Sequence, residues 1–137
     1  MAAIGRRAWQ LYRVVVTLIA AAVLVEFFLV GRGVFGIRGG AELEEQASLD
    51  PHRLLGNIIG GAALVLLVLA VVIWDRRLIV WSAVITVLAA AVQRAVALPE
   101  HPWVSGLHPV SGLAIFLIAG SLSHRAWRHR GKAESAA

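Results

Sequence analysis

The sequence contains no cysteine. This absence excludes disulfide bonds, thiolate metal sites, cysteine-linked c-type haem and cysteine nucleophiles. Charged residues are also scarce: they make up 15% of the chain, against about a quarter of a typical soluble domain. Hydrolase motifs are missing too, because Ser82, Ser105 and Ser111 have no nucleophile elbow around them. We therefore predict no catalytic residues and no stand-alone enzyme.

Long apolar runs are abundant instead, and they indicate a membrane protein. The 137 residues are 59% hydrophobic, and the charges gather between the runs. A soluble helical bundle would need a polar face along each helix, whereas residues 64–73 are apolar all round. Four runs approach the ~20 residues that span a bilayer, and the first is too long for a signal peptide core. They cover about 8–30, 52–74, 78–98 and 105–123.

These runs predict an all-α fold, a four-helix transmembrane up-down bundle that forms one domain over residues 1–137. The polar stretch 31–51 is rich in glycine and glutamate, which predicts a loop with room for a short surface helix at 42–48. Asp50 and Pro51 then suit the cap and first position of the second span. Ser105 can cap the fourth span. The basic tail 124–137, with His124 and His129, is expected to be flexible and solvated.

The distribution of arginine predicts the orientation. The net charge is +5, and the basic residues gather at the N-terminus, at the hinge 75–77 and in the tail. Because basic segments stay on the cytoplasmic side, we predict both termini inside and a location in the cell inner (plasma) membrane. The lipid bilayer is then the main partner, and nucleic acid is not expected.

Two histidines carry the functional prediction. His52 opens the second span as His52-x-x-x-Gly56, and His108 opens the fourth as His108-x-x-x-Gly112. Both fall at the predicted outer face. Glu26 and Gln93 lie four or five residues before the outer ends of the first and third spans, roughly 6–8 Å below the boundary. The chain thus repeats one pattern, with a histidine above a carboxyl or amide group.

This pattern suggests one b-type haem with His52 and His108 as its two axial ligands, for electron transfer or sensing. Gly56 and Gly112 would clear space for the porphyrin, and Glu26 or Gln93 would orient an imidazole from the second shell. The propionates would pair with arginine at the outer edge. The candidate arginines are Arg53 and Arg94, with Arg32 and Arg38 as further possibilities. A redox partner or another membrane subunit is then implied.

Three alternatives stay open at this point. The cluster of Glu26, His52, Gln93 and His108 can be purely structural, in a non-catalytic membrane subunit. His52, His108 and Glu26 can instead hold zinc or copper. Finally, Glu26 and the histidines can serve a quinone-binding or proton-handling protein.

Three segments resemble a family of small bacterial four-helix membrane proteins of unknown function. They are residues 28–36 (FLVGRGVFG), 52–56 (HRLLG) and 107–113 (LHPVSGL), within a similarity over roughly 14–123. The family tends to have glutamine at the position of Glu26, where this chain departs from it. The resemblance extends more distantly to cytochrome-b-like four-helix proteins whose paired histidines hold haem. It implies a four-helix membrane fold and assigns no activity.

Overall fold

The computed structural model describes residues 2–36, 42–96 and 102–134, and in these ranges all regular structure is helical. Four helices are long and apolar enough to cross a membrane. The elements are α1 (Ala2–Gly36), α2 (Glu42–Ile73), α3 (Arg76–Val87), the π-helical turn η1 (Leu88–Val92), α4 (Gln93–Val96), α5 (Pro102–Ser105) and α6 (Leu107–Glu134).

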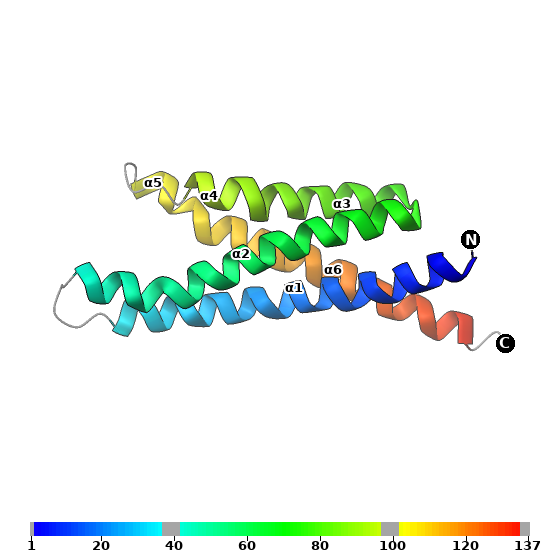
Figure 1. Ribbon diagram of the computed structural model, residues 1–137, viewed down its shortest axis with the longest axis horizontal. Helices are drawn as coiled ribbons and strands as arrows, with labels where there is room; N and C mark the ends of the chain where they lie inside the picture. The colour runs from blue at the N-terminus through cyan, green and yellow to red at the C-terminus, as the bar shows by residue number, and fades with distance from the viewer. Residues whose placement is uncertain (1, 37–41, 97–101, 135–137) are drawn as a thin grey trace.

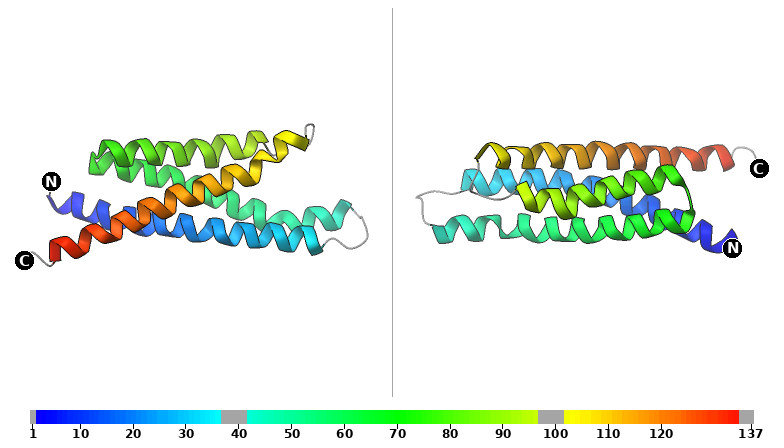
Figure 2. Two further views of the ribbon diagram at one scale, coloured as in Figure 1. Left: turned by 180° about the vertical axis from the view of Figure 1, so that it is seen from behind. Right: turned by 90° about the horizontal axis from the view of Figure 1, so that it is seen from above.

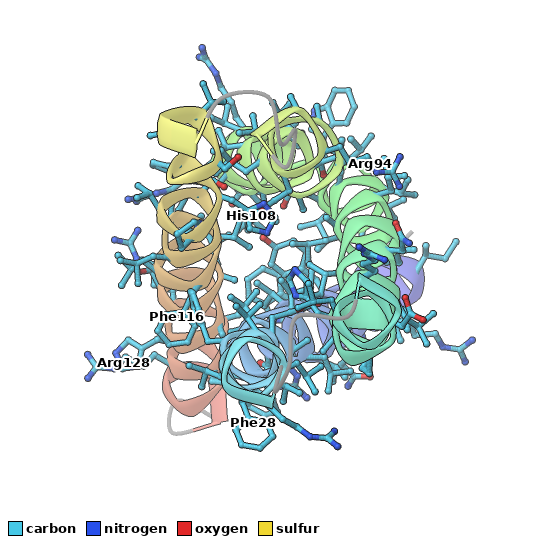
Figure 3. All side chains as sticks on the ribbon, turned by 90° about the vertical axis from the view of Figure 1, so that its left-hand side faces the viewer. Phe28, Arg94, His108, Phe116 and Arg128 are labelled. Atoms are coloured by element: carbon cyan, nitrogen blue, oxygen red, sulfur yellow. The ribbon has the colours of Figure 1, made fainter. Side chains whose placement is uncertain are left out.

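The long helices lie side by side along one axis, and both termini are at the same end of the molecule (Figure 1). In the turned views α6 runs across α1, which it contacts (Figure 2). Viewed from the other end, α2 and α6 stand on opposite sides of the bundle, with α1 between them on one side and α3 and α4 on the other (Figure 3). Every helix therefore turns one face toward a common centre.

The outer surface of the bundle is apolar, and the helices pack closely at its centre. Large exposed aliphatic and aromatic side chains occur on all four long helices, among them Leu18, Val68, Val80 and Leu117. Such a surface suits lipid and not water. The coarse prediction of an all-helical, multi-pass membrane protein is therefore supported by the fold. Small buried residues on the inner faces let the helices approach closely; they include Ala63, Ala70 and Ala119.

Two buried hydrogen bonds join helices in the centre. The Tyr12 and Ser82 hydroxyls are 3.2 Å apart and connect α1 with α3. The Thr86 hydroxyl donates to the carbonyl of Ala63 on α2 at 2.9 Å. In a membrane bundle each such bond contributes about 0.6 kcal/mol, so their main effect is to fix how the helices face one another.

The prediction of a loop at 31–51 is wrong, because most of the described residues in this range are helical. The first helix continues through Gly31 and Gly33 to Gly36, and α2 already begins at Glu42. Glycine is tolerated in membrane-spanning helices more readily than in soluble ones. Asp50 and Pro51 consequently lie inside α2 and do not start it. Pro51 removes one backbone hydrogen bond, but the surface helix predicted at 42–48 and the second span form one continuous element.

The described part of the tail is helical where a flexible segment was predicted. Helix α6 extends through Glu134, well beyond residue 123. Two of its apolar side chains in this part, Leu122 and Ala126, are buried. The added turns also carry Trp127, which donates a hydrogen bond to Thr17 of α1. At the start of α6, Gly106 separates it from Ser105, the last residue of α5.

The tight hinge after α2 is present. The Asp75 carboxylate caps α3 by accepting from the backbone N–H groups of Arg77 and Leu78 at 2.8 and 3.1 Å. Trp74, just before it, has φ of 61°, the left-handed conformation that glycine favours. A hinge of this shape therefore carries local backbone strain.

Replacing Trp74 with glycine should remove that strain. A non-glycine residue in the left-handed region costs roughly 1–2 kcal/mol, so Trp74→Gly is expected to be about 1 kcal/mol more stable than Trp74→Ala. Comparing the two variants cancels the loss of the indole ring, which is 82% exposed. Denaturant unfolding in mild detergent measures the difference. Equal stability of the two variants would show that the hinge stores no strain.

Candidate functional site

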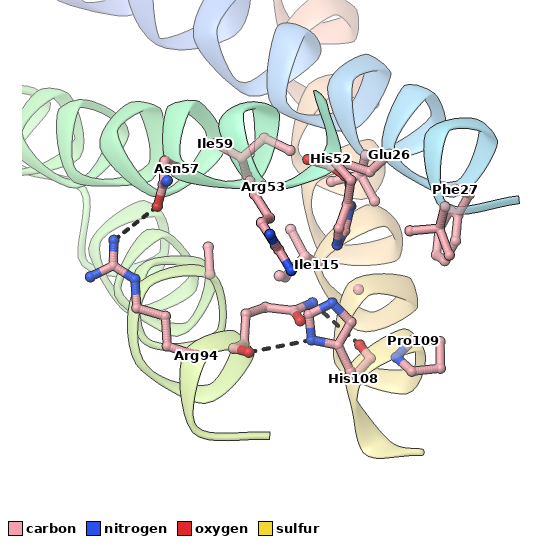
Figure 4. Close-up of a pocket in the computed structure, with 16 residues that line it drawn as sticks. Glu26, Phe27, His52, Arg53, Asn57, Ile59, Arg94, His108, Pro109 and Ile115 are labelled. Carbon is pink, nitrogen blue, oxygen red and sulfur yellow. Dashed lines mark hydrogen bonds and ion pairs between the residues drawn. The ribbon is translucent and has the colours of Figure 1, made fainter. Parts of the chain in front are cut away.

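The two histidines of the repeated pattern meet at one end of the bundle. Their ring centroids are 5.8 Å apart and their planes cross at 77°. His52 comes from α2 and His108 from the first turn of α6, where Pro109 needs no intrahelical N–H bond. The rings point toward each other from opposite sides of the bundle (Figure 4). Residues 56 positions apart in the sequence thus face one another across a common gap.

On each ring, Nδ1 has an oxygen partner. The Nδ1 of His52 contacts the carboxylate Oε2 of Glu26 on α1. The Nδ1 of His108 is 3.3 Å from the backbone carbonyl of Gln93. A carbonyl oxygen only accepts hydrogen bonds, so Nδ1 of His108 is the donor there. This leaves Nε2 of each ring for a ligand, which is how histidines that bind metal are usually oriented.

Gln93 reaches His108 because of the irregular helix before it. The π-helical turn η1 precedes Gln93 directly, and a π turn inserts one extra residue, which rotates the next part of the helix about its axis. Gln93 lies at the start of the short helix α4. Its side-chain Nε2 donates to the carbonyl of His108 at 3.3 Å. Gln93 therefore contacts His108 through both its backbone and its side chain.

Gly56 and Gly112 make room for these polar groups. A Cβ atom at Gly56 would lie 3.5 Å from Oε1 of Glu26, and one at Gly112 would lie 3.4 Å from Nε2 of Gln93. Both are contact distances, and a larger side chain would displace the carboxyl or the amide. Both glycines line the pocket, and their lack of a side chain also leaves room for the Glu26 and Gln93 groups.

The two histidines, Glu26 and Gln93 line a pocket of about 470 Å³. This volume is within the range of about 300–1,000 Å³ found for small-molecule sites. Its walls are mainly apolar, with side chains such as Val23, Phe27, Ile59 and Ile115. Arg53 and Arg94 stand at its edge and are exposed. Arg94 donates to Asn57 at 3.1 Å, and Arg53 reaches Asp50 at 3.4 Å. The pocket combines an apolar interior with two cations at its rim.

Two acceptors in the pocket wall lack a donor. Oε1 of Glu26 and Oε1 of Gln93 are buried and have no hydrogen-bond partner within the described residues. Buried acceptors of this kind normally meet a water molecule or a ligand. Sequence reasoning named both residues, but nothing in the sequence signals these free oxygen atoms, nor the place of Asn57 beside Arg94.

Among the described residues, Arg32 and His124 do not line the pocket. Arg32 is exposed on α1, and His124 is exposed near the far end of α6. Arg38, a further candidate for pairing with a propionate, lies outside the described residues. Across the described part of the chain there is no group of three or more His, Cys, Asp or Glu residues arranged to hold a metal ion, so the alternative of zinc or copper on His52, His108 and Glu26 gains no support.

The chain was compared with protein-family models, curated proteins and solved structures, and none of the three comparisons gave a match.

Proposed function

We propose that the protein is a multi-pass protein of the cell inner membrane that binds one b-type haem between His52 and His108, for electron transfer or sensing. The helices would pass up and down through the bilayer with both termini in the cytoplasm, as the arginine distribution predicts. The pocket would then lie near the outer face. A redox partner or another membrane subunit would exchange electrons with it.

The observation that supports this proposal best is the distance between the two rings. Metal–nitrogen bonds to histidine are about 2 Å long, and each ring centre lies about 1 Å behind its nitrogen, so two rings on one iron have centroids about 6 Å apart. The observed separation is 5.8 Å. Both Nδ1 atoms already contact oxygen acceptors, so the free Nε2 atoms match the ligand set of a bis-histidine haem.

The surrounding residues fit the rest of the group. Apolar walls suit a porphyrin, while Arg53 and Arg94 are available to pair with its propionates. Bound there, haem supplies one-electron redox chemistry. The protein would hold it with two neutral imidazoles, and Glu26 and Gln93 would keep the rings in orientation.

Haem reconstitution tests the proposal. Purified protein in mild detergent, supplied with haem, is expected to bind about one haem per chain and to show sharp reduced α and β bands, as a low-spin bis-histidine site requires. A helical protein that binds no haem under these conditions, by pyridine haemochrome assay and spectrum, would reject the proposal.

A second candidate is a quinone site, favoured by the two free acceptors. Quinol hydroxyl groups donate hydrogen bonds, and Oε1 of Glu26 and Oε1 of Gln93 both lack a donor in the described part of the structure. Haem has no comparable donors at its ring. Tight binding of a quinol analogue, without haem binding, would favour this candidate. Binding of neither ligand would favour a structural role for the four-residue cluster.

A further inference from the structure

A second polar cluster lies between α1 and α6, at the end that carries the termini. Its central residue is Arg13, which is only 8% exposed although it is charged. The guanidinium carbon lies 4.5 Å from the centre of the Trp127 ring, a cation–π contact. An arginine buried among membrane-spanning helices is costly and usually has a function.

The groups around Arg13 hold Trp127 in place without neutralising the arginine. The Thr17 hydroxyl donates to the backbone carbonyl of Arg13 at 2.6 Å and lies 2.7 Å from the Ser123 hydroxyl. It also accepts from the indole N–H of Trp127 at 3.0 Å. Its one donor and two acceptor positions are then used. This network fixes the ring against which the guanidinium stacks.

Among the described residues, the Arg13 guanidinium forms no ion pair. Its Nε is buried and has no hydrogen-bond partner among the described residues. Within the described part of the chain, the close pairs of acidic and basic side chains are Glu26–His52 and Arg53–Asp50, and both lie at the opposite end. The charged side chains on the same turns of α6 as Trp127, those of Arg125 and Arg128, are positive and exposed. The Asp75 carboxylate acts on Tyr12 at this end of the bundle but forms no ion pair with Arg13 within the described residues. A buried charge is normally paired, so an external anion would complete the cluster.

The depth of the cluster identifies that anion. From Arg13 to Glu26 along α1 is about 20 Å at 1.5 Å per residue, so the cluster lies toward the opposite membrane boundary from the pocket. Trp127 is 45% exposed beside it, as tryptophan is at the level of lipid headgroups. We propose that Arg13, stacked on Trp127 between α1 and α6, binds the phosphate of an anionic phospholipid from the surrounding membrane.

Lipid retention tests this proposal. The full-length protein is delipidated in mild detergent and titrated with phosphatidylglycerol or with phosphatidylcholine of the same acyl chains, and bound lipid is counted by native mass spectrometry. Arg13→Gln is expected to weaken phosphatidylglycerol binding roughly 10- to 100-fold, the effect of one charged hydrogen bond. The matched control is Arg7→Gln, an exposed arginine on the same helix, which should change binding less than about threefold.

Three results would overturn the proposal. One is equal loss in Arg13→Gln and Arg7→Gln. Another is equal retention of the two lipids by the wild type. The third is displacement of phosphatidylglycerol by millimolar inorganic phosphate, which would assign the site to a free anion. If Arg13→Gln does not fold, Arg13→Lys replaces it. Lysine keeps the charge but loses the stacked, bidentate geometry of the guanidinium. Phosphatidylglycerol binding by Arg13→Lys that is unchanged from the wild type would therefore also reject the site.

Discussion

Replacing either His52 or His108 with alanine is expected to abolish the low-spin haem spectrum. Each imidazole would supply one nitrogen ligand in the proposed site, and no other histidine with a described side chain lines the pocket. A single remaining ligand holds haem weakly and leaves an open coordination position. Bound haem per chain and the reduced-minus-oxidised difference spectrum measure the effect, with a loss of the sharp α band in both variants.

The control is His124→Ala, which removes an exposed histidine from the same helix as His108. It should keep the full haem content. Helix content by circular dichroism shows that each variant is folded. A folded His52→Ala or His108→Ala protein that retains the wild-type spectrum would exclude the paired-ligand site, whatever else the pocket binds.

Removing the Glu26 carboxylate should weaken haem retention about 10- to 100-fold, the usual effect of losing an outer partner of a metal-ligating histidine. Glu26 contacts Nδ1 of His52 and so fixes the direction in which Nε2 points. In Glu26→Ala the ring loses that constraint and its Nδ1 loses its partner. Haem transfer to an external acceptor protein, followed by absorbance, gives the ratio of affinities.

The conservative variant Glu26→Gln distinguishes the loss of the hydrogen bond that orients His52 from the loss of side-chain volume. The amide oxygen of Glu26→Gln can still accept from Nδ1, so this variant is expected to stay within a few-fold of wild type. Asp50→Ala serves as the matched control, because Asp50 is an exposed carboxylate two residues before His52. If Glu26→Ala binds haem as tightly as Asp50→Ala does, Glu26 has no part in positioning the ring.

Much of the fold follows from hydropathy alone. Residues 64–73 are apolar on every side, which suits a helix in lipid and no soluble alternative. The ends of the helices were less predictable. Gly31 and Gly33 usually break soluble helices, and Asp50–Pro51 has the pattern of a helix start, yet both pairs lie inside α1 and α2. Local propensity is a weak guide where the membrane favours continuous hydrogen bonding along a helix.

The residues of the candidate site could be predicted from the sequence, but the contacts between them were harder to predict. A His-x-x-x-Gly repeat at the start of the second and fourth spans, which would run in the same direction in an up-down bundle, predicts that His52 and His108 lie at one depth. The π-helical turn at Leu88–Val92 leaves no clear trace in a run of alanine, leucine and valine, so the approach of Gln93 to His108 could not be foreseen. The stacking of Arg13 on Trp127 was also hidden, because it depends on how α6 crosses α1.

The position of the two histidines on opposite helices has a mechanical consequence. Helices α2 and α6 face each other across the bundle (Figure 3), and His52 and His108 extend from them into the same gap. A molecule bound to both histidines would connect α2 directly with α6. Without it, these two helices are held together mainly by the helices that lie between them. The stability of the protein would then depend on the concentration of this molecule. At a hundred times its dissociation constant, the molecule would add about 2.7 kcal/mol to the free energy of unfolding.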